Sequence, residues 1–400
     1  MKQAFIYDAI RSPRTRAKDS GGLHDLTPHE LLKQLYESLR QRTGLDPDTI
    51  GEIILGCVTQ HGEQAGNIAK TSALYAGWPS SIGGMTVSRF CSSGIDAISL
   101  AALKIGAGQE RAIIAGGVEM MSRVPMLADR ARAFIDPAFA ARCQMLMMGS
   151  GADLIASLHG VSREQADAVA LQSQQRAAHA REAGYFRSIV PIENPEKGLT
   201  VDADECIRGD ITPEQLAELP PAFADLGAKG VDQAQLAAYP QLDQINHIHT
   251  AGNSPAMCDG ASVLLIGEEY LGETLRRPPR ARIVGAATAS SDPLQVLTGC
   301  VSATERLLRE QALTADEIDL FELHEAFAAT TIKAQQDLGI GDEKLNVNGG
   351  VIALGHPMGA TGAIMAGTLL DELERRDLQT GVVAASGAAG SGSALLLQRI

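Results

Sequence analysis

Three residues of this 400-residue chain have the types and surroundings of a nucleophilic site: Cys91, His324 and His356. Cys91 stands just before an apolar run that predicts a buried helix. A cysteine at a helix N-terminus lies at the positive end of the helix dipole, which favours the thiolate. We therefore expect its pKa to lie below the ordinary value of about 8.5. We also expect the hydroxyls of Ser92 and Ser93 to cap this helix.

The two histidines lie where ligands commonly bind. His324 directly follows the apolar run 320–323, at the carboxyl end of a predicted strand. His356 lies in the glycine-rich segment 348–362. A lone cysteine or histidine is more often structural, but imidazoles near a thiol predict acid–base and nucleophilic catalysis. No HExxH spacing or cysteine cluster indicates a metal, and the glycine-rich segment lacks the Gly-Lys-Ser/Thr ending of a phosphate-binding loop.

The chain ends in a second flexible segment, Ala-Ala-Ser-Gly-Ala-Ala-Gly-Ser-Gly-Ser-Ala, at positions 384–394. Such a backbone could turn several amide groups toward one point and form an oxyanion hole. It could equally be a tight turn into the last strand. Both interpretations stay open at this stage.

Composition excludes several classes of function. The net charge of −14 argues against nucleic acid or an anionic membrane as a partner. Six dispersed cysteines predict reduced thiols in the cytoplasm. No apolar run is long enough for membrane insertion, so we expect a soluble cytoplasmic protein.

Apolar runs at 4–10, 52–57 and 111–117 predict buried strands that alternate with helices. This alternation predicts a parallel sheet with helices on both faces. From 121 to 249 the pattern changes, with proline breaks and amphipathic helices, which predicts an inserted lobe. The strand pattern resumes near 262–266.

The second half of the chain repeats the first. Ile50 matches Ile318 and Gly94 matches Gly362, and both pairs are 268 positions apart. One register shared by separate elements predicts two similar α/β halves around a pseudo-twofold axis, with a site where equivalent loops converge. In this register the first half supplies the cysteine and the second half supplies both histidines.

Phe90-Cys-Ser-Ser-Gly94, His324-Glu-Ala-Phe-Ala328 and Gly355-His-Pro357, in this order around a central insertion, resemble the thiolase family of acyl-CoA acyltransferases. The resemblance covers essentially the whole chain. It implies an α/β fold of five αβαβα layers built from two similar halves, with an inserted loop lobe in the first half. The implied divisions are an N-terminal half at 1–120 plus 250–275, a coenzyme A-binding lobe at 121–249 and a C-terminal half at 276–400.

The resemblance also implies roles for individual residues. Cys91 would carry the acyl group as a thioester, and His356 would take its proton. His324 would help His356 to stabilise a thioester oxygen, and the backbone N–H groups of Cys91 and Ala388 would form a second oxyanion hole. Acyl-CoA and coenzyme A would be substrates, with no permanently bound cofactor or metal, in a homodimer or a dimer of dimers. The expected substrate-binding residues are Met148, Gly252, Asn253 and Ser254.

One catalytic position departs from the family pattern, because the second cysteine of the family falls on Ser386. A hydroxyl is a far weaker acid than a thiol and a poor base near pH 7. The predicted activity is thiolysis of 3-ketoacyl-CoA or the reverse Claisen condensation, with Ser386, water or His356 moving the second proton. Alternatives are a decarboxylating condensation or thioester hydrolysis with a Cys-His-His site, or a non-catalytic acyl-CoA-binding protein.

Overall fold

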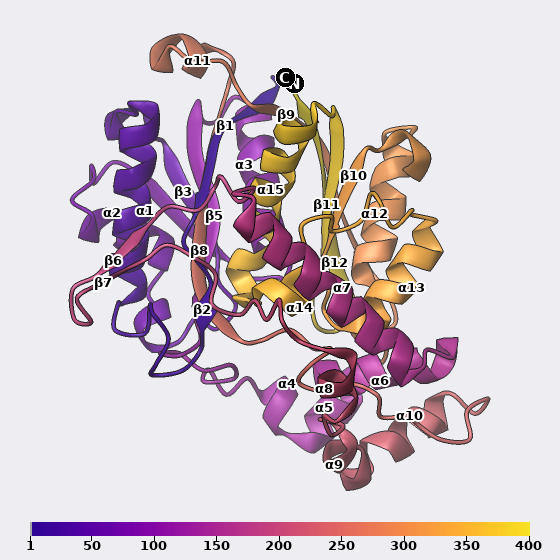
Figure 1. Ribbon diagram of the computed structural model, residues 1–400. Coiled ribbons are helices and arrows are strands. Elements are labelled where there is room, and N and C mark those ends of the chain that lie inside the picture. The colour runs from indigo at the N-terminus through magenta and orange to yellow at the C-terminus, as the bar shows by residue number, and fades with distance from the viewer. Residues whose placement is uncertain (1) are drawn as a thin grey trace.

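The strands of both halves join in one mixed sheet in the computed structural model, which describes residues 2–400 (Figure 1). The strand order is β10-β11-β12-β9-β1-β8-β5-β3-β4, with β2 paired beside β8. The sheet has two groups of strands: the first contains β1, β8, β5, β3, β4 and β2, and the second contains β9, β12, β11 and β10. The groups meet where β1 pairs with β9 over three residues. The strands are β1 (Ala4–Arg11), β2 (Thr15–Arg16), β3 (Glu52–Gly56), β4 (Gly83–Val87), β5 (Ala112–Met120), β8 (Cys258–Gly267), β9 (Ala281–Ser290), β10 (Leu320–Leu323), β11 (Thr380–Ser386) and β12 (Ser391–Arg399).

The expectation of a parallel sheet is wrong for half of the strands. Strand β3 runs parallel to β4 and β5, and β10 runs parallel to β11, as helical crossovers require. Strands β1, β8, β9 and β12 form antiparallel pairs. The reason is connectivity: β8 returns after the inserted segment, and only a short turn joins β11 to β12.

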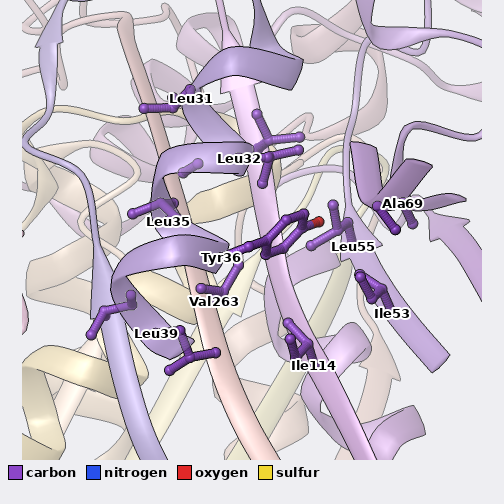
Figure 2. Close-up of a cluster of buried hydrophobic side chains, with 14 of the residues drawn as sticks. Leu31, Leu32, Leu35, Tyr36, Leu39, Ile53, Leu55, Ala69, Ile114 and Val263 are labelled. Carbon is purple, nitrogen blue, oxygen red and sulfur yellow. The ribbon is translucent and has the colours of Figure 1, made fainter. Parts of the chain in front are cut away.

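Helix α1 (Pro28–Thr43) covers the outer face of the first group of strands, beside α2 (Ile68–Tyr75). It begins at Thr27, which forms a capping box with Glu30, and has a proline at its start. Its apolar side chains recur at helical spacing and are buried against the sheet (Figure 2). The labelled residues of this core are Leu31, Leu32, Leu35, Tyr36, Leu39, Ile53, Leu55, Ala69, Ile114 and Val263.

Two helices form the central layer, α3 (Ser93–Gly106) and α15 (Met358–Arg376), and they lie between the two groups of strands (Figure 1). Helix α15 is buried without interruption from Met358 to Leu373. Helices α12 (Gly299–Glu310) and α13 (Ala328–Leu338) cover the outer face of the second group. This order of helix, sheet, helix, sheet and helix layers confirms the expected five-layer fold.

The repeat seen in the sequence is also present in the structure. Short 3₁₀ turns at Pro47–Thr49 and Ala315–Glu317 match across the 268-position offset, as do the first residues of β5 and β11. The same offset relates Gly94 of α3 to Gly362 of α15, the two residues at which these helices contact each other. A Cβ added to Gly94 would lie 2.7 Å from the backbone nitrogen of Ala363, and one added to Gly362 would lie 2.8 Å from that of Ile95. The helices therefore approach each other more closely than any side chain allows.

The segment between β5 and β8 adds no strand to the main sheet. Its helices α6 (Met148–His159) and α7 (Arg163–Glu182) pack against α13 and α14 (Val351–Leu354) of the second half. Its hairpin, formed by β6 and β7, contacts α1 through Gln34 and Glu193. None of the helices within residues 2–400 has the length and apolar character needed to cross a membrane. The elements of the segment are α4 (Arg132–Ile135), α5 (Pro137–Cys143), α6 (Met148–His159), α7 (Arg163–Glu182), β6 (Ile192–Asn194), β7 (Leu199–Val201), α8 (Pro213–Ala217), α9 (Ala224–Leu226) and α10 (Asp232–Ala238), and α11 (Tyr270–Leu275) follows β8.

The contact between α3 and α15 gives a stability prediction with a control in the same helix. Gly362→Ala should lower the free energy of unfolding by about 1–3 kcal/mol, because its methyl group meets the backbone of Ile95. Gly367→Ala should be neutral or stabilising by up to about 1 kcal/mol, since its Cβ would meet neighbours only at 3.6 Å and alanine favours helix. Urea unfolding measures both. Equal shifts in the two variants would contradict the close contact.

Candidate active site

Cys91 lies in the turn between β4 and α3, buried with 8% of its surface exposed. Phe90, directly before it, has a positive φ of 50°, which is unusual for a bulky residue and makes the turn sharp. The expectation that the serines cap α3 is wrong. The Ser92 hydroxyl instead donates to the backbone carbonyl of Ala385 at 2.7 Å, so it ties the cysteine turn to the second half of the molecule.

The Cys91 thiol faces His356, with 3.1 Å between Sγ and Nε2. The other ring nitrogen of His356, Nδ1, lies 2.7 Å from the Thr361 hydroxyl oxygen. If Nδ1 carries the ring proton and donates it to Thr361, Nε2 is left as an acceptor for the thiol proton. Thr361 therefore orients the imidazole as a base toward Cys91.

The loop before α15 places His356. Gly355 has a φ of 92°, a conformation that favours glycine, and the His356 N–H donates to the carbonyl of Ala256 at 2.9 Å. Helix α15 begins two residues later, at Met358. The histidine is thus fixed between a glycine turn and the start of α15, whose residues are all buried from Met358 to Leu373.

His324 follows β10, and its ring lies beside the His356 ring with 4.5 Å between the centroids. Its Nδ1 lies 3.2 Å from the backbone carbonyl of Ser386. A carbonyl only accepts hydrogen bonds, so Nδ1 carries the ring proton. Nε2 then has a free lone pair, and it is buried with no hydrogen-bond partner among residues 2–400. Burial lowers the pKa of His324 to about 4, so the ring is neutral.

The expected low pKa of Cys91 is wrong for this structure. Burial, and then the nearby Glu119, raise the pKa of the Cys91 thiol to about 12, despite the favourable contribution of its own backbone N–H. Burial, His324 and Arg14 together hold the pKa of His356 well below its ordinary value. The resting pair is therefore a neutral thiol and a neutral imidazole, and the helix start does not outweigh desolvation.

Glu119 is a buried carboxylate that the motif analysis did not single out. It is the last but one residue of β5 and accepts hydrogen bonds from the backbone N–H groups of Val58, Thr59 and Gly359, each at 2.9–3.0 Å. Gln64 donates to it at 2.8 Å. These bonds join the loop after β3 to the first turn of α15. An acidic residue at the end of an apolar strand was the available sequence signal.

Ser386 ends β11, and its hydroxyl has two protein partners. It donates to the carbonyl of Leu297 at 3.0 Å and accepts from the N–H of Cys300 at 2.9 Å. The side chain is buried and connects the strand to the start of α12. Only the Ser386 carbonyl reaches the histidine pair, through His324.

Ala388 lies in the turn after β11, where its carbonyl accepts from the Ser391 N–H at 3.2 Å. It belongs to an apolar cluster that also includes Met148 at the start of α6. The cluster combines residues from the inserted segment and from the second half, and it reaches Phe90 beside the nucleophile. Its buried members are Ala152, Val296, Leu297, Ala326, Phe327 and Ala388, with Phe90, Phe134, Met145, Leu146, Met148 and Phe223 packed against them.

The three expected binding residues near position 253 differ in their surroundings. Asn253 is buried, donates to Asp167 at 2.8 Å and accepts from the Thr250 N–H at 2.8 Å, so it stabilises its own loop. Gly252 lies against leucine side chains. The Ser254 hydroxyl has no partner within residues 2–400 and lines a cavity of about 300 Å³. Arg16, Lys18 and Arg208 also line this cavity and give it a basic wall.

Comparisons with known proteins agree with this arrangement. Residues 4–231 match the thiolase N-terminal domain, and residues 277–399 match the thiolase C-terminal domain. The chain is 39% identical over its full length to a 3-ketoacyl-CoA thiolase of Shewanella oneidensis, and 40% identical to one of Aliivibrio fischeri, with all of each relative covered. The crystal structure of the Bacillus anthracis acetyl-CoA acetyltransferase superimposes with a TM-score of 0.87 at 34% identity, covering 100% of this chain and 99% of that chain.

A two-half α/β fold with a buried cysteine–histidine pair at the junction, together with these matches, defines the class: the chain belongs to the thiolase family. Within that family it is an enzyme, an acyltransferase of the thiolase type.

The raised pKa of Cys91 predicts how the thiol reacts with iodoacetamide. We expect its labelling rate to rise about tenfold for each pH unit from pH 7 to pH 9 and to keep rising beyond, because the thiolate fraction grows tenfold per unit below a pKa of about 12. Peptide mass spectrometry follows the labelling, and the exposed Cys143 is the reference in the same samples. A Cys91 rate that levels off below pH 8 would show that the thiolate already forms at neutral pH.

Proposed function

We propose that the enzyme cleaves 3-ketoacyl-CoA by thiolysis through an acyl thioester on Cys91, and that it catalyses the reverse condensation less readily. The observation that carries this proposal is the 3.1 Å contact between Cys91 Sγ and His356 Nε2. The names of the relatives, 3-ketoacyl-CoA thiolases of 39–40% identity, support the same substrate class.

In the first step the thiol proton moves to His356 Nε2 as the sulfur attacks the 3-keto carbonyl of the substrate. The bond between C2 and C3 then breaks, which leaves the acyl group on Cys91 and the enolate of acetyl-CoA. The enolate takes up a proton and leaves as acetyl-CoA. Because the pKa of His356 lies well below its ordinary value, its imidazolium is a strong acid, suited to return that proton.

In the second step coenzyme A attacks the thioester. Its thiol proton goes to a neutral imidazole, the bond between Cys91 sulfur and the acyl carbon breaks, and Cys91 recovers a proton. The N–H groups of Cys91 and Ala388 are the proposed donors to the oxyanion that forms on the acyl oxygen. The Ala388 N–H has no backbone acceptor among the described residues, which leaves it available for this role.

The missing second thiol is the feature that most needs an explanation. The Ser386 hydroxyl is engaged with Leu297 and Cys300, which argues against it as the second proton carrier. The unpartnered Nε2 of His324 lies in the site with its lone pair free. We therefore assign the second proton transfer to the imidazole pair: the proton that His356 takes from the Cys91 thiol passes by way of His324 Nε2 to the enolate. His324 with a pKa of about 4 is a weak base but a strong conjugate acid, so proton donation in thiolysis is favoured over proton removal in condensation.

The segment 121–249 is proposed to bind coenzyme A and to cover the acyl group. Met148 and Phe134 come from this segment and contact the apolar cluster around Phe90, which suits an acyl chain next to Cys91. Ser254 and the basic wall of the 300 Å³ cavity are the proposed contacts for polar and phosphate groups of coenzyme A.

Intact-protein mass spectrometry after incubation with a panel of 3-ketoacyl-CoA and acyl-CoA compounds tests the function. We expect a mass increase equal to the acyl group, lost on addition of coenzyme A and absent from Cys91→Ser. Adduct formation with 3-ketoacyl-CoA must release acetyl-CoA. If the protein instead decarboxylates a malonyl thioester and does not cleave ketoacyl-CoA, the condensing function replaces thiolysis. If no acyl adduct forms, the non-catalytic binding role replaces both.

Variants of the three polar residues separate their tasks. His356→Ala should slow acylation of Cys91 by about 10²–10⁴-fold, the usual contribution of a positioned base. His324→Ala should slow release of acetyl-CoA more than it slows alkylation of Cys91. Ser386→Ala should keep thiolysis within about threefold, yet lose about 1–3 kcal/mol of stability, because two buried backbone groups lose their partner.

Rapid-quench measurements of the two steps and urea unfolding give these values. A Ser386→Ala enzyme that acylates Cys91 normally but loses thiolysis would show that the hydroxyl, and not the imidazole pair, moves the second proton. Ser386→Cys is the complementary variant: a clear gain in condensation would show that the weak basicity of His324 limits that direction in the parent enzyme.

A further inference from the structure

A second pair of sulfur atoms lies close to the active-site loop and takes no part in the proposed reaction. Cys206, in the loop after β7, and Cys258, the first residue of β8, are 52 positions apart in the chain, yet their Sγ atoms are 3.2 Å apart. Both side chains are buried and both thiols are free. Two thiols at this separation need only a small movement to form a disulfide, whose bond length is about 2.05 Å.

The surroundings of the pair distinguish the two thiols. The hydrogen bond from Cys258 is the largest influence that lowers the pKa of Cys206, and the cations Arg14 and Arg16 act in the same direction. The pKa of Cys258 is raised well above its ordinary value, by that same hydrogen bond and by burial. The Arg14 guanidinium is buried, and its Nε and one terminal nitrogen have no hydrogen-bond partner among residues 2–400. Cys206 is therefore the more nucleophilic thiol, with Cys258 poised beside it.

Small reagents can reach only one of the two cysteines. Cys206 forms part of the wall of the 300 Å³ cavity, together with Ser254 and Met257. It is 6% exposed, whereas Cys258 is fully buried. A nucleophilic thiol on a cavity wall with a second thiol behind it is the arrangement of an attacking and a resolving cysteine.

The buried cysteine of the pair touches the loop that places the catalytic histidine. A Cβ added to Gly355 would lie 2.2 Å from Cys258 Sγ, so the loop backbone passes directly over the sulfur. Met257, the neighbour of Cys258 in the chain, pairs with His356 in an isolated β-bridge. Any displacement of Cys258 is therefore passed to His356 through backbone contacts.

We propose that Cys206 and Cys258 form a redox-active dithiol, which hydrogen peroxide closes to a disulfide, and that closure moves the His356 loop and slows the reaction at Cys91. The Cys206 sulfur attacks the peroxide oxygen, the O–O bond breaks, and Cys206 becomes a sulfenic acid as one water leaves. The Cys258 sulfur then attacks Cys206, and the sulfenic hydroxyl leaves with the Cys258 proton as a second water. Two thiols are oxidised and one peroxide is reduced to two waters.

Mass spectrometry of the Cys91→Ser protein tests bond formation without interference from the catalytic thiol. Hydrogen peroxide should lower the intact mass by ~2 Da, and non-reducing peptide mapping should show a Cys206–Cys258 cross-link that dithiothreitol removes. This measurement requires no turnover, so its outcome is independent of the proposed thiolysis. Absence of the cross-link under conditions that oxidise the exposed Cys143 would overturn the proposal.

The effect on the active site is tested in the enzyme that retains Cys91. After peroxide treatment and removal of the excess, labelling of Cys91 by iodoacetamide and formation of the acyl adduct should both fall at least about tenfold, because a displacement near 1 Å is enough for such a loss. Dithiothreitol should restore them. Cys206→Ser should be protected, whereas Cys143→Ser should behave as the parent enzyme. Equal inhibition of Cys206→Ser, or a complete cross-link with unchanged rates, would overturn the link to His356.

Discussion

The contact between α3 and α15 is the constraint on which the active site depends. One helix begins two residues after Cys91 and the other two residues after His356, so the separation of their first turns sets the distance between sulfur and nitrogen. Gly94 and Gly362 allow each helix to lie against the backbone of the other. Because the two glycines occupy the same position in the two halves, the pseudo-twofold axis passes between them, whereas Cys91 and His356 come from positions that do not correspond. Symmetry in the scaffold thus produces an asymmetric pair.

Burial determines how the site can work. It keeps Cys91 protonated and both histidines neutral, so these three side chains carry no charge before substrate binds. In the free enzyme they therefore carry no desolvation cost as ions. In the proposed reaction, charge appears on them only as bonds form and break, next to the backbone N–H groups proposed to stabilise the oxyanion. The carboxylate of Glu119 opposes the thiolate, but it accepts hydrogen bonds from three backbone N–H groups and from Gln64, and so organises the loops around Cys91.

Much of the fold and of the reactive groups could be predicted from the sequence. The shared 268-position register predicted two similar halves, and the motifs around Cys91, His324 and His356 predicted which groups would meet. The direction of strands such as β8 could not be predicted, since it depends on where the chain returns after the inserted segment. Side-chain partners were also beyond local patterns: Ser92 and the Ser386 hydroxyl bond to residues from distant elements.

The pKa of Cys91 also depends on contacts that local sequence patterns do not reveal. A helix start lowers a thiol pKa through a local dipole, which sequence position reveals. Desolvation depends on everything that covers the sulfur, including Met121 and Met358 from other elements, and only the folded structure shows that sum. The lowering of the thiol pKa at the helix start, which the sequence predicted, is smaller than the raising of the pKa by desolvation.

The position of β8 also determines when the protein can fold during synthesis. This strand lies between β1 and β5 and pairs with both, although nearly 140 residues separate the end of β5 from its first residue. Until the ribosome has released residue 267, β1 and β5 each have an unpaired apolar edge, and the nucleophile half cannot close. The intervening segment is therefore made before the scaffold it covers is complete. The edge of β1 is therefore open to aggregation for about two thirds of synthesis, and the edge of β5 for a little over a third.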